Sequence, residues 1–77
     1  MLSEHDRVVL VTNLPQYRLV AGDIGTVVFV HRNRAGYEVE FVALDGETVA
    51  VVSLDATQVR PIARREIAHA RLVSQAA

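Results

Sequence analysis

The sequence predicts an all-β fold, a small barrel of five strands, and three observations carry this prediction. Fourteen of the 77 residues are valine, and they fall into four clusters separated by turn residues, as in small β folds. A polar loop at residues 13–22 contains Pro15 and ends at Gly22, in the manner of the RT loop of SH3 barrels. Gly25 lies inside the strand that follows, where glycine is costly unless the backbone bulges or passes close to another strand. These features predict a strongly bent, SH3-like barrel.

The first two strands are expected at residues 6–12 and 23–32. Both are runs of β-branched and other apolar residues that lie between turn-forming residues. Asn and Gly at residues 33–36 suit left-handed backbone positions, so this segment predicts a hairpin turn into the next strand.

The third strand, residues 37–43, alternates most cleanly. Every second residue from Tyr37 to Phe41 is apolar, and Glu38 and Glu40 lie between them. Successive side chains of a strand point to opposite faces of the sheet. The apolar set therefore predicts the core face of this strand, and the glutamates predict its solvated face.

The last part of the barrel follows a second turn. The Asp-Gly pair at residues 45–46 is the strongest short-range hairpin motif in the chain and leads into a fourth strand at residues 47–54. Residues 55–58 predict a single helical turn capped by its aspartate. A brief fifth strand is expected at residues 59–62, where the proline fits only at a sheet edge or a strand end.

Two segments are expected: a barrel at residues 1–62 and a C-terminal helical tail at residues 63–77. The tail is rich in alanine, arginine, glutamate and leucine, which are good helix formers. Its imperfect apolar stripe consists of Ala63, Ile67, Ala70 and either Leu72 or Val73. We expect a short helix that frays near Ser74.

Three strands are apolar on both faces, which predicts an oligomer. We expect a core made of Val8, Leu10, Val27, Phe29, Tyr37, Val39, Phe41, Val49, Val51 and Leu54. The outward-facing set is then Val9, Val11, Val28, Val30, Ala50 and Val52. Such a bare apolar patch is unusual on a monomer. Either the C-terminal helix covers it through Ile67, Ala70 and Leu72, or a second copy does, and we favour a homodimer to which the tail contributes.

Composition predicts a cytoplasmic protein. There is no cysteine, so the chain has no disulfide and no thiolate ligand for a metal. The first residues lack the features of a signal peptide, and the apolar runs, such as residues 27–30, are far too short to span a bilayer. The net charge of −1 gives little support to a nucleic-acid surface, because nonspecific affinity for nucleic acid comes from excess positive charge.

The sequence predicts neither a cofactor, a metal site nor an enzyme. His5, His31 and His69 match no short metal-binding motif. Glu38 and Glu40 share a strand face and could divide acid and base roles, but alternating glutamates are typical of a solvated face with cross-strand arginine partners.

Arginines in the loops and the tail are candidate binding residues. Tyr17 and Arg18 lie in the long loop, and Arg32 and Arg34 flank the first hairpin turn, so these four are candidates for contact with a partner. All eight basic residues are arginine, which favours a GC-rich genome over a phosphate site. The basic tail could dock on an acidic partner or pair with the barrel's own glutamates.

The order of motifs resembles a known family. Leu-Pro, then Gly-Asp-Ile-Gly-Thr-Val-Val, Tyr-Glu-Val-Glu-Phe, Asp-Gly-Glu-Thr and Leu-Asp-Ala-Thr-Gln-Val-Arg-Pro resemble the bacterial family catalogued as domain of unknown function 4926. The resemblance covers residues 6–62. It implies an SH3-like barrel in small stand-alone bacterial proteins, and it implies no activity. The Gly-Asp-Ile-Gly-Thr-Val segment alone is also similar to KOW motifs of ribosome- and RNA-polymerase-associated proteins.

These observations predict a noncatalytic protein-interaction module, an accessory or antitoxin-like regulator of a partner protein. The alternative is a KOW-like RNA- or ribosome-associated module, and a metal-dependent enzyme is the third hypothesis. Salt-dependent RNA binding would favour the second class, and co-purification of one protein would favour the first.

Overall fold

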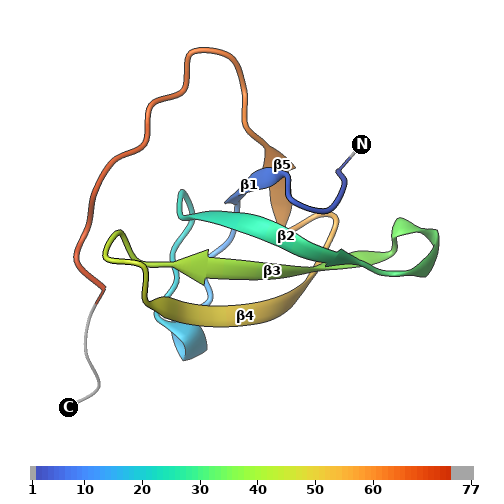
Figure 1. The fold of residues 1–77 in the computed structure, drawn as a ribbon, viewed down its shortest axis with the longest axis horizontal. Coiled ribbons are helices and arrows are strands. Elements are labelled where there is room, and N and C mark those ends of the chain that lie inside the picture. Colours follow the sequence, from blue (N-terminus) through green and yellow to red (C-terminus); the bar gives the residue numbers. More distant parts are fainter. Residues whose placement is uncertain (1, 74–77) are drawn as a thin grey trace.

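The computed structural model describes residues 2–73 as one antiparallel sheet of five strands with a long C-terminal tail (Figure 1). The strands are β1 (Arg7–Leu10), β2 (Ile24–Val30), β3 (Gly36–Val42), β4 (Thr48–Asp55) and β5 (Val59–Pro61). Two short 3-10 turns, η1 (Pro15–Tyr17) and η2 (Arg32–Arg34), lie in the connections. The predicted all-β class is confirmed, and no helix of residues 2–73 could span a membrane.

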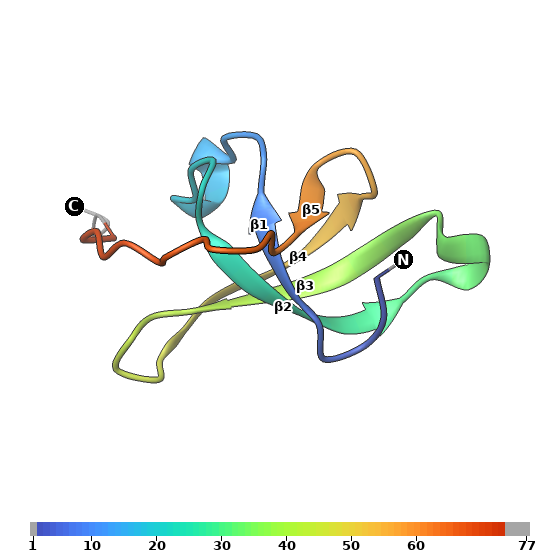
Figure 2. The ribbon, with the colours of Figure 1, turned by 90° about the horizontal axis from the view of Figure 1, so that it is seen from above.

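The sheet is strongly bent but does not close into a barrel. Its strand order is β4-β3-β2-β1-β5, so β4 and β5 are the two free edges. Figure 2 shows β1 and β5 standing over one side of the longer β2, β3 and β4. The predicted closed barrel is therefore wrong. The last strand has only three residues and ends at Pro61, which has no N–H to donate to a further ladder.

The core fills the concave side of the bent sheet. Val8, Leu10, Val27 and Val39 are almost completely buried. The long loop before β2 closes on itself, because Leu14 and Leu19 exchange backbone hydrogen bonds of 2.9 and 3.1 Å. The buried apolar cluster is Leu2, Val8, Leu10, Leu14, Leu19, Val27, Tyr37, Val39, Phe41, Val52, Leu54 and Val59.

A β-bulge in β2 decides which of its side chains reach this core. Val27 pairs with Val39 but Phe29 pairs with Glu38, so two steps along β2 match one step along β3. The extra residue inverts the alternation of β2. Phe29 consequently lies on the outer face with 51 % of its surface exposed, and Val30 packs against the core. The prediction had these two residues the wrong way round.

The register of β4 corrects a second part of the predicted core. Val52 lies opposite the buried Val39 and is itself buried, whereas Val51 lies opposite Glu40 and is 53 % exposed. Directly opposite residues share a face of the sheet, so Val52 faces inward and Val51 outward. A second irregularity between Phe41 and Val42 leaves the neighbouring side chains partly buried against the core, namely Val49 and Ala50.

The tail is extended and irregular instead of helical. After β5 it turns at Arg65, which has a φ of 63°, loops away from the sheet and returns beside the β3–β4 hairpin (Figure 1). The predicted helix is wrong for residues 63–73, and the predicted fraying at Ser74 lies outside the described residues. A helix this short is marginal in water. The Asp55–Gln58 segment is likewise a turn and no helix, in which the Gln58 side chain accepts the Asp55 N–H.

Candidate functional site

A groove of about 900 Å³ lies where the tail meets the sheet. Its walls are the β3–β4 hairpin, the loop before β2 and residues 68–73 of the tail. The hairpin turn is held by hydrogen bonds from Ala43 N–H to Glu47 O and from Gly46 N–H to Ala43 O, of 2.8 and 2.9 Å. Gly46 has a φ of 95°, which confirms the predicted Asp-Gly turn. This turn places Leu44 at the tip, 94 % exposed.

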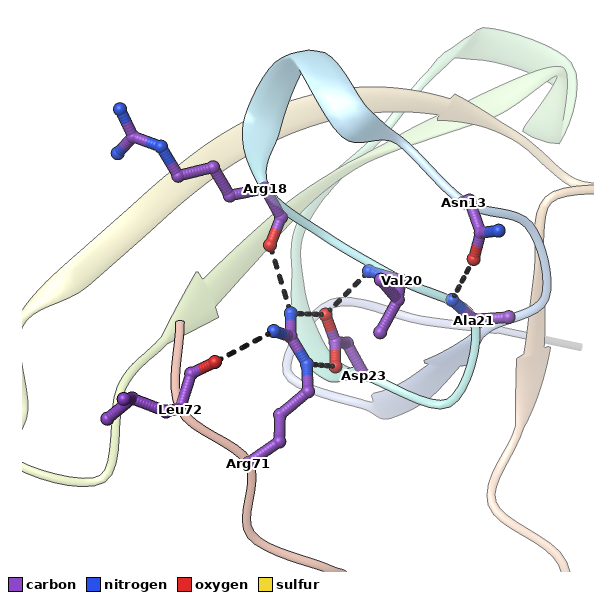
Figure 3. A network of polar contacts seen from close by, with 7 residues as sticks. All are labelled: Asn13, Arg18, Val20, Ala21, Asp23, Arg71 and Leu72. Carbon is purple, nitrogen blue, oxygen red and sulfur yellow. Dashed lines mark hydrogen bonds and ion pairs between the residues drawn. The ribbon is translucent and has the colours of Figure 1, made fainter. Parts of the chain in front are cut away.

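An arginine of the tail connects two walls of the groove, the tail itself and the long loop before β2. Arg71 forms a bidentate pair with Asp23, with 2.8 Å from Nε to Oδ1 and 2.5 Å from Nη2 to Oδ2 (Figure 3). Its Nη2 also donates to the backbone oxygen of Arg18 at 3.0 Å. Bidentate pairs of this kind fix orientation as well as distance. The pair therefore holds the tail against the long loop and makes the tail one wall of the groove.

The environment of Asp23 favours its ionised form. Burial raises the pKa of Asp23, but the hydrogen bonds from Arg71 and from the Val20 N–H, together with the charge of Arg71, outweigh burial and bring the pKa below its ordinary value. The Val20 N–H donates to Oδ2 at 2.9 Å. At neutral pH the Asp23 carboxylate is therefore ionised and links the loop to the tail.

A second ion pair sets the direction of the tail. Arg60 in β5 donates from Nη1 and Nη2 to the two carboxylate oxygens of Glu66, at 2.8 and 2.6 Å. The Ala63 N–H adds a bond of 2.6 Å to Oε1. The hydrogen bonds from Arg60 and Ala63 lower the pKa of Glu66 to about 2. The basic tail was expected to dock on an acidic partner or to pair with glutamates of the barrel, whereas Arg60 pairs with Glu66 and Arg71 with Asp23.

Release of the tail by acid is a testable consequence. A carboxyl group whose pKa is lowered by folding stabilises only while ionised, so the Asp23 contact is fully present above the ordinary value of 3.8 and is lost as the pH falls through the lower folded pKa. We expect NMR signals of tail amides to move to random-coil positions in that pH range. Asp23→Asn should release the tail at neutral pH, since an amide oxygen can still accept the Val20 N–H. Asp55→Asn, which alters an exposed carboxylate that forms no ion pair within residues 2–73, should leave the tail in place, and an unmoved tail in Asp23→Asn would contradict the assignment.

The outer face of the sheet carries a separate polar cluster. Glu38 Oε2 lies 2.6 Å from His31 Nε2 and accepts a hydrogen bond of 2.5 Å from Ser53. The hydrogen bonds from Ser53 and His31 hold the pKa of Glu38 below its ordinary range. A hollow of about 400 Å³ adjoins His31 and Ser53.

This cluster does not have the order of a nucleophilic relay. In a catalytic triad the histidine lies between the hydroxyl and the carboxylate, but here Ser53 and His31 both contact the carboxylate of Glu38. The neighbouring Glu40 accepts a hydrogen bond of 2.8 Å from Thr48. Among residues 2–73, no group of three or more His, Asp or Glu side chains could hold a metal ion.

The structure separates the four predicted binding residues into two places. Tyr17 and Arg18 lie on the η1 loop, and Arg18 lines the groove. Arg32 lies in η2, at the opposite end of the molecule in both views (Figures 1 and 2). The backbone of Arg34 belongs to the same turn, and its side chain lies outside the described part of the structure. The four residues therefore do not form one surface.

The residues predicted to form an oligomer surface do not all lie on one exposed surface. Val52 is buried in the core cluster and Val30 packs against it, so these two do not face outward. Val9 points to the opposite face from its core neighbours Val8 and Leu10, as predicted, but it is buried there and forms no exposed surface. Val11 and Val28 are exposed. On the tail, Ile67 and Leu72 are 92 % and 93 % exposed. Only Leu72 of this set lines the groove.

Leu44 was not among the predicted site residues, although its position in the sequence is unusual for a leucine. Leu44 immediately precedes the Asp45-Gly46 turn, where polar residues are the rule. An apolar residue at the tip of a hairpin is solvated in the isolated chain, and its place opposite the tail became apparent only from the fold.

Comparison with known proteins supports the resemblance and adds no activity. The sequence profile of the family described as domain of unknown function (DUF4926) matches residues 4–61. No curated protein and no solved structure matches significantly. The matched residues include every strand of the sheet. The chain therefore belongs to the DUF4926 family.

Proposed function

We propose that this protein is a noncatalytic protein-interaction module that holds an apolar segment of a partner in the groove between the β3–β4 hairpin and the tail. The observation that carries the proposal is the pair of leucines on the two walls of the groove. Leu44 on the hairpin and Leu72 on the tail are both almost fully exposed. Exposed apolar residues that converge on a concave surface are typical of binding sites for apolar groups.

The charges around the groove favour a protein over a nucleic acid. The hairpin wall carries Asp45 and Glu47. The guanidinium of Arg71 is already occupied by Asp23. Phosphate binding needs free positive charge along the contact surface. The lining offers Arg18 for this purpose, against the two carboxylates of the hairpin wall. In this proposal the protein acts in the bacterial cytoplasm as an accessory or regulator of its partner.

A cross-linking experiment tests the groove. A photoreactive amino acid at Ala43, beside Leu44, should capture the same partner protein from the native host in repeated experiments. Leu44→Asp and Leu72→Asp should each reduce the capture about tenfold or more, because a few buried apolar anchors carry most of the binding energy of an interface. Ile67→Asp is the matched control, since Ile67 is an equally exposed tail residue that does not line the groove.

Three results would contradict this function. Equal capture by the parent and both leucine variants would show that the leucines are not contacts. Equal loss in all three aspartate variants would point to a nonspecific charge effect. Salt-dependent capture of RNA in place of a protein would favour the KOW-like alternative.

A further inference from the structure

The two edges of the sheet are protected very differently. β5 has only three residues, ends in Pro61, and holds Arg60, whose guanidinium is tied to Glu66. β4 has eight residues and, within residues 2–73, pairs with β3 alone. From Thr48 to Leu54 it contains neither a charged residue nor a proline. Charges, prolines and short length are the usual features that prevent an edge strand from pairing with another chain, so β5 is protected and β4 is open.

We propose that the free edge of β4 binds an extended segment of a partner protein, which adds to the sheet as a sixth strand and carries basic residues at its two ends. The first residues of this edge adjoin the groove, because Glu47, Thr48 and Val49 also line it, but neither leucine of the groove belongs to β4. Main-chain hydrogen bonds supply the affinity in strand addition, and alternate side chains supply the specificity.

The charges at the ends of β4 determine the chemistry of the partner. Glu47 directly precedes the strand and Asp55 ends it, and neither carboxylate forms an ion pair in the described part of the chain. The strand between them spans about 23 Å, at 3.3 Å per residue. An added strand with an arginine or lysine near each end would place one positive charge beside each carboxylate.

The same charges disfavour a second copy as the occupant. In an antiparallel pair of two β4 strands, Asp55 of one copy would lie near Thr48 and Glu47 of the other. Like charges at directly opposite positions destabilise a strand pair, and here the repulsion would occur at both ends.

The two faces of β4 indicate which positions of the added strand should be apolar and which polar. Val52 and Leu54 face the core, and Val51 is exposed on the outer face. Side chains of an added strand that point inward would therefore lie beside Val52 and Leu54, the buried residues of β4. The expected segment has apolar residues at these alternate positions and polar residues between them.

Two synthetic peptides test the proposal by NMR. The first is acetyl-Arg-Thr-Val-Thr-Val-Thr-Val-Arg-amide, and the second has glutamate in place of both arginines. The arginine peptide should shift and protect the backbone amides of residues 48–55. It should bind at least about tenfold more tightly than the glutamate peptide, because charge complementarity selects partners. The double variant Glu47→Lys, Asp55→Lys should reverse this preference while its thermal melt confirms that it is folded.

The groove and the edge can be told apart in the same experiment. Leu44→Asp should leave peptide binding to β4 unchanged, whatever it does to the partner of the groove. Absence of β4 shifts at millimolar peptide, equal binding of both peptides, or an unreversed preference in the double variant would each overturn the proposal. Concentration-dependent dimerisation through β4, seen by light scattering, would overturn it in favour of a second copy.

Discussion

Phe41→Ala should lower the free energy of unfolding by about 3–5 kcal/mol, the usual loss when a buried phenylalanine is truncated. Phe41 is 2 % exposed and belongs to the core cluster. A chain of this length is expected to have a total stability of only about 4–12 kcal/mol. The variant should therefore lose between about a quarter and all of the parent's stability, which urea denaturation would show as a lower midpoint.

Phe29→Ala is the matched control, because it removes the same side chain from the same sheet. Phe29 lies on the outer face beyond the bulge, in edge contact with the ring of His31 at 5.5 Å between centroids. Its truncation should cost about 1 kcal/mol or less, since it leaves no buried cavity. Equal losses for the two variants would show that the bulge does not divide them between core and surface.

Gly25→Val should be the second most destabilising change, even though valine is the better strand former. A Cβ at Gly25 would lie 2.5 Å from Val39 Cγ1, 2.9 Å from Phe41 Cε1 and 3.0 Å from Glu40 O. Overpacking a tight core costs about 1–3 kcal/mol, and the two further methyl groups of valine add to the clash. The melting temperature should fall well below that of the parent.

Thr26→Val serves as its control, because it adds a valine at the next position of the same strand. Thr26 is only partly buried, and its side chain points to the opposite face from Gly25. Its stability should stay within about 0.5 kcal/mol of the parent. A Gly25→Val protein as stable as the parent would mean that β2 and β3 can separate without cost. The expectation from sequence, that glycine permits a close approach here, would then be wrong.

Both variants bear on function, because the core cluster and the groove share two residues, Leu19 and Phe41. Phe41 belongs to the core cluster and also lines the groove. Measurements of partner binding should therefore use Leu44 and Leu72, which are exposed and leave the core intact.

Local features of the sequence determined the strands and most turns. Alternation from Tyr37 to Phe41 placed β3 and its buried face correctly, because the period of a strand depends only on its own backbone. The Asp-Gly turn and the Asn33 turn were equally predictable, since Gly46 and Asn33 adopt the positive φ values that these residue types tolerate. The long loop before β2 was also placed correctly, because it ends at Gly22, which adopts a φ of 100°. The candidate site was only partly predictable, because its other walls come from distant segments.

Tertiary structure alone decided which apolar residues face the core. One inserted residue in β2 sends Phe29 outward, and the register of β4 brings Val52 in. A run of consecutive apolar residues has no alternation of its own, so its orientation depends on the neighbouring strand. The conformation of the tail likewise depends on contacts with residues distant in sequence. Helix propensities differ by only tenths of a kcal/mol per residue, whereas Arg71 finds Asp23, 48 residues away in sequence, only after the loop has folded.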